Sequence, residues 1–280
     1  MKTTTADILA AVSVDRMKTT VGILAQPSFA GRRVASAGGQ AARSWLVEAL
    51  RDLGADVDID VDEFDVPGYP APAANLYADW PRASKSSAKV LLTAHYDGVG
   101  DTELLHRPGA ADNAAGVAVV LEAARLVRNG SQNLTLSVAL LDGEEVGAVG
   151  SARHAAQLAE THRTPWVINV DGAGELHEAV AVEAGGPAHP ILAALDAAGR
   201  ATGVALRAGQ VASDNRRYAA AGLPTVGLGA GMHGYHTEHD TAEHVQPETL
   251  SAMARLVIAT VAELAAHDST NTEKKVENAR

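Results

Sequence analysis

The sequence predicts a single α/β domain in which a doubly wound, mostly parallel mixed β-sheet is flanked by helices. Short apolar runs bounded by turn residues, such as 90–94 and 166–170, have the length and composition of strands covered on both faces. Segments with helical periodicity alternate with these runs, which is the pattern of βαβ units. No linker, repeat or low-complexity block interrupts this alternation, so we expect residues 1–267 to form one domain.

The N-terminal quarter is predicted to contain helix and then strand. Residues 1–25 mix Ala, Val and Ile in a helix-like pattern. Residues 39–53 carry apolar side chains at helical spacing, and Gly54 suits the position that follows a helix end. In 56–64 apolar residues alternate with Asp, which predicts a half-buried strand with an acidic outer face.

The remaining elements follow from the same two periodicities. Turn-rich stretches at 67–72 and 82–87 are expected to be loops that bracket a short edge strand at 75–79. The later strands are expected at 90–94, 134–141, 166–170, 179–183 and 225–228. The later helices are expected at 114–127, 151–160, 190–202, 215–221 and 247–267. The polar segment 268–280 has no apolar face and is expected to be frayed or disordered.

Composition and charge exclude several classes of function. The 23 basic and 34 acidic residues give a net charge of −11, which opposes binding to nucleic acid and to anionic membranes. The longest uncharged stretch, 218–237, is broken by Gly and Pro, and the apolar run 8–14 is enclosed by Asp residues, unlike a signal peptide. The sequence therefore predicts a cytoplasmic protein without nucleic-acid or membrane partners. Because Cys is absent, any metal site must use His and carboxylates.

Polar residues follow the predicted strands at their carboxyl ends, where open α/β sheets bind ligands. His95 comes directly after 90–94, and Asp171 directly after 166–170. The complete set that we expect at this edge is His95, Asp97, Asp112, Glu144, Glu145, Asp171 and His236.

This set has the composition of a site for two divalent metal ions. Zn²⁺, Co²⁺ and Mn²⁺ accept imidazole nitrogen and carboxylate oxygen, and two neighbouring ions need a bridging carboxylate. If Asp112 bridges, each ion has three protein ligands. Asp97 lies two residues from His95 on the same strand face and is expected to accept its ring N–H. Glu144 points away from Glu145 and is free to act as a general base. The expected ligands are His95, Asp112, Glu145, Asp171 and His236.

Each of these residues also has a purely structural explanation when taken alone. Asp112 precedes a helix and could be an N-cap, and Glu144 and Glu145 could be acids favoured at a helix start. His236 lies in a His-rich stretch whose other members are expected at the surface. The coincidence of five such residues at strand ends favours the metal site over separate structural roles.

Several short motifs occur in an order that is typical of one enzyme family. The motifs are His95-Tyr96-Asp97, the run from Gly109 through Asp112-Asn113 to Gly116, Asp142-Gly143-Glu144-Glu145 with Gly147, Gly150 and Ser151, Asn169-Val170-Asp171, and Tyr235-His236-Thr237 with Asp240-Thr241. With these motifs the chain resembles the M28-type zinc aminopeptidases from about Gly31-Arg32 to about residue 265.

The resemblance implies a role for each residue. It implies two ions, most plausibly zinc, and peptide or aminoacyl substrates. It also implies a cis peptide after Asp112. The implied roles are one ion held by His95 and Asp171, a second held by Glu145 and His236, a bridge by Asp112, orientation of His95 by Asp97, and general-base action by Glu144.

Two departures from the family pattern concern the substrate pocket. Ala111 stands where members commonly carry an acidic residue, and Ser213-Asp214-Asn215 stands where they carry Ser-Asp-His. Neither position is an implied ligand. His106, which precedes the bridging loop, is expected to be an exposed loop residue.

The leading hypothesis is a two-metal aminopeptidase, and the resemblance connects Asp171, rather than Glu at that position, with aminopeptidases. Three alternatives stay open: a glutaminyl-cyclase-like acyltransferase with one metal, a carboxypeptidase or deacylase on the same site, and an inactive binding domain. A terminal carboxylate would need a basic partner, for which the candidates are Arg107, Arg153, Arg216 and Arg217. No Gly-x-Ser-x-Gly or His-Glu-x-x-His motif occurs, which disfavours a serine hydrolase and a single-metal zincin. Side-chain preference and oligomeric state stay open.

Overall fold

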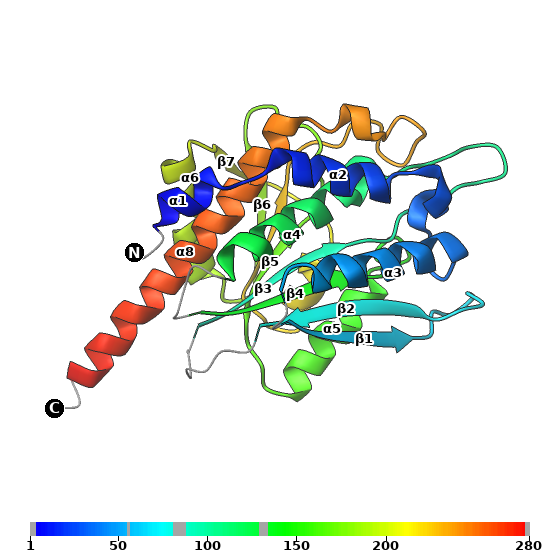
Figure 1. Cartoon of the computed structure of the whole chain (residues 1–280). Coiled ribbons are helices and arrows are strands. Elements are labelled where there is room, and N and C mark those ends of the chain that lie inside the picture. Colours follow the sequence, from blue (N-terminus) through cyan, green and yellow to red (C-terminus); the bar gives the residue numbers. More distant parts are fainter. Residues whose placement is uncertain (1–3, 55–56, 81–87, 129–133, 278–280) are drawn as a thin grey trace.

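An eight-stranded mixed sheet forms the centre of the computed structural model, which describes residues 4–54, 57–80, 88–128 and 134–277 (Figure 1). The strands are β1 (Asp58–Phe64), β2 (Ala73–Asp79), β3 (Ala88–His95), β4 (Leu134–Leu141), β5 (Trp166–Val170), β6 (Val180–Gly185), β7 (Leu206–Ala208) and β8 (Thr225–Gly229). The helices are α1 (Thr5–Ala10), α2 (Val14–Leu24), α3 (Ala37–Arg51), α4 (Ala115–Val127), α5 (Val149–Glu160), α6 (His189–Thr202), α7 (Asn215–Ala220) and α8 (Pro247–Glu277). The predicted fold class is confirmed.

The strand order is β1-β2-β4-β3-β5-β8-β6-β7. The four central strands β4, β3, β5 and β8 are parallel, so their carboxyl ends lie at one edge of the sheet. β2 pairs antiparallel with both β1 and β4, and β6 pairs antiparallel with β8. The parallel centre is the part of the sheet that brings the predicted site residues together.

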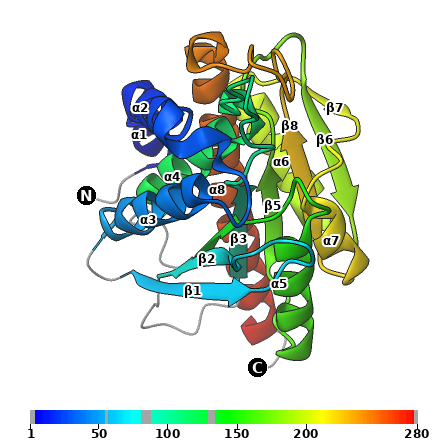
Figure 2. The same cartoon turned by 90° about the vertical axis from the view of Figure 1, so that its right-hand side faces the viewer.

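Helices cover both faces of the sheet (Figure 2). α2, α3, α4 and α8 lie on one face, and α6 packs against α8 on the same side. α5 and α7 lie on the other face. Strand residues alternate between the two cores, because Val90 and Leu92 belong to the first core and Leu91 to the second. This two-sided burial explains why the central strands read as continuous apolar runs.

The prediction of an edge strand at 75–79 is wrong. β2 lies between β1 and β4, and the acidic strand β1 forms the edge. A strand with one charged, solvated face is suited to an edge, where charge discourages pairing with another chain. The loop expected at 82–87 lies outside the described residues.

Two further differences concern the chain ends. The N-terminal helical segment is divided into α1 and α2, and the hydroxyl of Ser13 caps the second helix by accepting a hydrogen bond from the backbone N–H of Arg16. The backbone of α8 is helical through residue 277, into the segment 268–280 that the sequence predicts to be frayed or disordered (Figure 1). Extending an existing helix avoids the cost of nucleation, so this polar segment needs no apolar face of its own to be helical.

The segment Pro247–Ala266 of α8 is long and apolar enough, by length and composition, to cross a membrane. In this fold 67% of it is buried, and its apolar residues belong to the first core. A central helix of a folded domain meets the same test, so this segment is weak evidence for a membrane span.

Two helical glycines provide a test of the packing between α4 and the sheet. A Cβ at Gly116 would meet Oδ1 of Asn113 and would lie 2.6 Å from the backbone oxygen of Val170. A Cβ at Gly22 in α2 would meet no atom within 4 Å. Gly116→Ala is therefore expected to lower the free energy of unfolding by about 1–3 kcal/mol, whereas Gly22→Ala is expected to raise it by about 0.5–1 kcal/mol. Urea unfolding measures both, and equal effects of the two substitutions would contradict this packing.

Candidate metal centre

The predicted ligands come from three parallel strands and two loops. His95 is the last residue of β3, Asp171 directly follows β5, and Glu145 follows β4 after a turn at Gly143, whose φ of 77° suits glycine. Asp112 lies in the turn Ala110–Ala114 that precedes α4, and His236 lies in the loop after β8. The arrangement of strands thus brings residues from five separate parts of the sequence to one edge.

The five side chains form two groups that share Asp112. In the first, Nε2 of His95 lies 3.3 Å from Oδ1 of Asp112 and 3.6 Å from Oδ2 of Asp171. In the second, Nε2 of His236 lies 3.1 Å from Oδ2 of Asp112 and 3.0 Å from Oε2 of Glu145. Within each group the three ligand atoms lie within 4.8 Å of one another. Asp112 therefore presents one oxygen to each group.

Buried atoms without partners show that these residues fit metal ions. Among the described residues, Nε2 of His95 and Nε2 of His236 have no hydrogen-bond partner, although carboxylate oxygens lie close to both. Oε1 of Glu145 and Oδ1 of Asp171 are likewise unpartnered. Buried polar atoms that converge without hydrogen bonds are the arrangement that a cation satisfies, and the nitrogen and oxygen donors suit zinc.

Asp97 is placed behind His95, on the side away from the two groups. Nδ1 of His95 lies 3.2 Å from the backbone oxygen of Asp97, to which it is hydrogen bonded, and 3.5 Å from Oδ1. The two carboxylate oxygens of Asp97 accept the backbone N–H groups of Glu144 and Glu145, at 3.1 and 3.2 Å. Asp97 therefore fixes the loop of the Glu pair as well as the ring of His95, and the sequence carries no signal for that second contact.

Asp240 holds the loop that carries Asp112. Its carboxylate accepts the backbone N–H groups of Ala111, at 2.6 Å, and of Asp112, at 3.1 Å. The Asp112–Asn113 peptide is cis, as the family resemblance implies. No role for Asp240 is evident from the sequence alone, although this residue lies in the motif around His236.

Arg32 is a completely buried cation beside the site. Its guanidinium donates to the backbone oxygens of Leu24, Tyr96, Pro108 and Gly109, at 2.6–2.8 Å. Tyr96 directly follows His95, and Gly109 directly precedes the turn Ala110–Ala114 that carries Asp112. Burial lowers the pKa of Arg32, and the surrounding carboxylates, including Asp240 and Asp112, oppose that shift. In the sequence, Arg32 is notable only as the start of the family resemblance.

Glu144 and Asp142 differ in their surroundings. Burial raises the pKa of Glu144 to about 8, and its carboxylate makes no hydrogen bond with any described residue. Burial and the charge of Asp97 raise the pKa of Asp142 to about 7, but its Oδ2 accepts the backbone N–H of Ala74 and the hydroxyl of Tyr96, both at 3.0 Å. Asp142 is therefore a buried structural acid, and Glu144 is the one with a free carboxylate.

The metal-ligating candidates perturb each other strongly. Burial opposes charge on His95, but Asp171 and the other nearby carboxylates outweigh it and raise the pKa of the ring well above its usual value. The carboxylates of Asp112 and Glu145, which lie close to its ring, raise the pKa of His236. Burial and the charge of Asp112 raise the pKa of Glu145 to about 8. Without cations His95, His236 and Glu145 therefore favour their protonated states.

The segment Ser213-Asp214-Asn215, which departs from the family pattern, is buried. Asp214 is completely buried, and burial raises its pKa to about 7. Oδ1 of Asn215 accepts the backbone N–H of Ser213, at 3.2 Å, and its side chain lies against Gly227. Nδ1 of His106 lies 2.8 Å from Asp101 in a half-buried pair, so His106 is paired rather than freely exposed.

We expect the metal-free chain to lose stability as the pH rises from 5 to 8. Glu144 and Glu145 have a folded pKa of about 8, well above their unfolded value near 4, so the folded chain binds more protons than the unfolded chain in this range. The raised pKa values of His95 and His236 act in the same direction. The expected loss exceeds about 1.4 kcal/mol, the equivalent of one pKa unit on one group.

Urea unfolding of chelator-treated protein at pH 5, 6.5 and 8 measures this loss. Excess Zn²⁺ should reduce it, because metal ions bind the deprotonated ligands of the folded chain. A metal-free chain that is more stable at pH 8 than at pH 5 would contradict the assigned surroundings of these carboxylates.

Solved structures with the same fold include zinc aminopeptidases and a cyclase. The zinc aminopeptidase BSAP of Bacillus subtilis has a TM-score of 0.77 at 16% identity, over 90% of this chain and 95% of that one. A glutaminyl cyclase of Porphyromonas gingivalis has a TM-score of 0.72 at 21% identity, over 90% and 98% of the two chains. At these identities the likeness shows the fold alone.

The matches in sequence are more specific than the likeness in fold. The chain is 28% identical over 211 residues to aminopeptidase YwaD of Bacillus subtilis, which covers 70% of this chain and 44% of YwaD. It spans less than half the length of the curated relatives that it matches. The model of peptidase family M28 matches residues 75–261, a range that holds all five candidate ligands, Asp97 and Glu144. The chain belongs to peptidase family M28.

Proposed function

We propose that this chain is a two-metal zinc aminopeptidase that removes N-terminal residues from peptides. The observation that carries the proposal is the position of Asp112, which directs one oxygen toward His95 and the other toward His236. Two ligand groups that share one carboxylate are the arrangement required for a pair of neighbouring ions. Family membership and the aminopeptidase relative support the same class of reaction.

Zinc, when bound, would supply Lewis-acid polarisation of the scissile carbonyl and a water that is easier to deprotonate. The chain would supply the base. Glu144 has a free carboxylate, and its backbone is fixed by Asp97, so it is placed to accept a proton from the attacking water. The same carboxyl group can then donate that proton to the leaving amine. A pKa raised by burial towards neutrality suits a group that must both accept and release a proton.

The charge of the site favours an amino terminus over a carboxyl terminus. The carboxylates of Asp112 and Asp171 contribute to a negative environment that attracts an ammonium group. Three of the four arginines considered for carboxylate binding are engaged elsewhere: Arg153 with Asp62, Arg216 with Glu183, and Arg217 with the backbone oxygen of Gly147. The guanidinium of Arg107 has no partner among the described residues and is the remaining candidate.

Zinc stoichiometry combined with two variants tests the assigned roles. We expect two Zn²⁺ ions per chain for the unmodified protein and for Glu144→Gln, and one for His236→Ala, which removes a ligand of the second group. Glu144→Gln should lower turnover by at least roughly two orders of magnitude, the usual contribution of a general base. Elemental analysis and kcat on an aminoacyl anilide provide the two readouts.

The two readouts separate the alternatives. A plateau at one ion in the unmodified protein would favour a glutaminyl-cyclase-like reaction, which a Gln-initiated peptide would report directly. Near-normal kcat in Glu144→Gln, with two ions retained, would show that another group is the base.

Three substrates test the direction of cleavage. An aminoacyl anilide should be hydrolysed, and its N-acetylated form should lose most of kcat/KM because acetylation removes the ammonium charge. An N-blocked dipeptide with a free carboxylate should be a poor substrate. Efficient hydrolysis of this dipeptide would overturn the aminopeptidase assignment and would favour Arg107 as the partner of the substrate carboxylate. It would not contradict the proposed two-metal site.

A further inference from the structure

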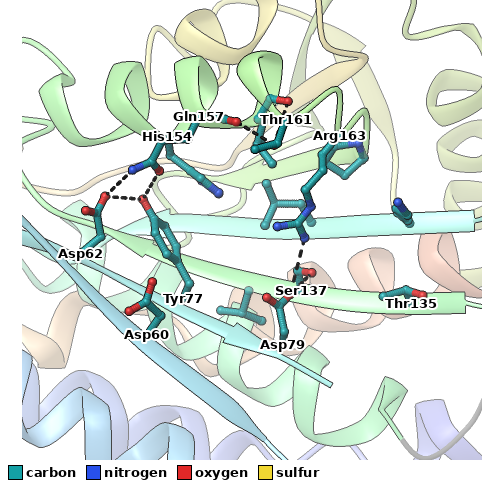
Figure 3. Close-up of a pocket in the computed structure, with 15 residues that line it drawn as sticks. Asp60, Asp62, Tyr77, Asp79, Thr135, Ser137, His154, Gln157, Thr161 and Arg163 are labelled. Carbon is teal, nitrogen blue, oxygen red and sulfur yellow. Dashed lines mark hydrogen bonds and ion pairs between the residues drawn. The ribbon is translucent and has the colours of Figure 1, made fainter. Parts of the chain in front are cut away.

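A second cavity, of about 320 Å³, lies beside α5 on the face of the sheet that this helix partly covers (Figure 3). Side chains from one face of β1, β2, β4 and β3 line it, together with residues of α5 and the turn that follows. It extends to Lys89 at the start of β3, whereas His95 ends that strand. Leu91 is the lining residue on β3 nearest to His95, and the four-residue separation between these positions corresponds to about 13 Å of extended strand. None of the five candidate ligands lines this cavity, so it is separate from the metal centre.

Acidic side chains of β1 and β2 line one side of the cavity, and Arg163 lies beside one of them, Asp79. Figure 3 shows Asp60 and Asp62 at one end and Arg163 towards the other. Asp62 is paired with Arg153, but Asp60 makes no hydrogen bond or ion pair with any described residue. Arg163 has only a long contact, 3.9 Å, with Asp79. An acid and a base thus remain available to a ligand.

The floor between these charges is aromatic and apolar. The rings of Tyr77 and His154 are stacked with their centroids 4.3 Å apart, and Leu91 and Leu158 extend the apolar surface. His154 is 7% exposed, and its Nδ1 lies 2.9 Å from the hydroxyl of Tyr218. Its Nε2 has no hydrogen-bond partner in the described part of the chain. Burial lowers the pKa of His154 to about 4, so the ring offers a neutral polar atom to the cavity.

We propose that this cavity binds a free amino acid with an apolar side chain. Its ammonium group would lie near Asp60, its carboxylate near Arg163, and its side chain on the Tyr77–His154 floor. Asp60 and Asp79 are diagonal neighbours across β1 and β2, about 7–8 Å apart, so a short zwitterion can reach both Asp60 and the Arg163 beside Asp79. The volume is at the lower end of ligand pockets, which suits a molecule of this size.

A chain of hydrogen bonds connects this floor with the metal centre. The side-chain amide of Asn75 donates to the hydroxyl of Tyr77, at 3.0 Å, and to the backbone oxygen of Gly150, at 2.9 Å. Its oxygen accepts the backbone N–H of Asp142, at 3.1 Å. Asp142 stands two residues before Glu144. The proposal extends to regulation: a ligand on Tyr77 would perturb Asn75 and, through the backbone of Asp142, the loop that carries Glu144.

A titration followed by NMR tests the proposal on the zinc-loaded, full-length protein. L-Leucine should shift the ring resonances of Tyr77 and His154 and the side-chain amide of Asn75 in a saturable way. Isoamylamine lacks the carboxylate and 4-methylpentanoate lacks the ammonium group, and each should bind at this site at least about tenfold more weakly than leucine.

Matched variants locate the binding. Asp60→Asn and Arg163→Gln should each weaken the leucine-dependent shifts at least about tenfold, because each removes one charged partner. Arg200→Gln is the control, since Arg200 is an exposed arginine on α6 that pairs with Asp196 and does not line the cavity. Neither Asp60 nor Arg163 belongs to the metal centre.

Three results would overturn the proposal: no saturable shift of the Tyr77 and His154 rings, equal binding of isoamylamine, or unchanged binding in Arg163→Gln. Shifts at the two rings without any at Asn75 would overturn the connection to the metal centre. These readouts do not depend on hydrolysis. Failure of the aminopeptidase proposal would therefore leave them unaffected, and their failure would leave the aminopeptidase proposal intact.

Discussion

The concentration of buried negative charge at one edge of the sheet is the constraint on which the rest of this structure depends. Asp97, Asp112 and Asp171 are all less than 9% exposed, and Glu144 and Glu145 lie beside them. Desolvation alone would drive such groups to protonate or to separate. The fold opposes both outcomes with backbone N–H donors for Asp97 and Asp240, and with two imidazoles that lie beside Asp112. The buried atoms left without a partner among the described residues include one each of His95, Glu145, Asp171 and His236, at the two candidate ion positions.

Arg32 connects this constraint to the N-terminal segment, which lies outside the family match at 75–261. One guanidinium bonds the end of α2, through Leu24, to the chain after His95 and to the residues that precede the bridging loop. A buried cation that donates only to backbone oxygens leaves its charge uncompensated by a direct partner, and the surrounding carboxylates supply that compensation at longer range. The N-terminal segment is thus part of the site's electrostatic balance as well as of the core.

The sequence was sufficient to predict the part of the site that is determined by strand ends. His95 and Asp171 end apolar runs, and any parallel sheet must bring such residues together. Asp240 and Arg32 could not be found in the same way, because their partners are backbone groups far away in the sequence. Nearly every residue type has these backbone groups, so the sequence does not indicate which of them make a contact. The position of β2 was missed for a related reason, since an alternating acidic strand and a short apolar strand do not reveal which of them is outermost. The end of α8 differs from the prediction for 268–280, because the extension of a helix depends on the segment that precedes it as well as on the composition of the added residues.

Asp142 and Glu144 show why a raised pKa is insufficient to identify a base. They stand two residues apart in one loop, and burial raises both pKa values, to about 7 and about 8. Asp142 uses an oxygen to bind the backbone of β2 and the hydroxyl of Tyr96, so its carboxylate holds two strands together. Glu144 uses only backbone groups: its N–H donates to Asp97, and its oxygen accepts the backbone N–H groups of Gly147 and Ala148, while its carboxylate makes no hydrogen bond with the described residues. Because a base must move a proton without breaking the structure that positions it, the absence of a side-chain hydrogen bond to the described residues, more than the pKa, distinguishes Glu144.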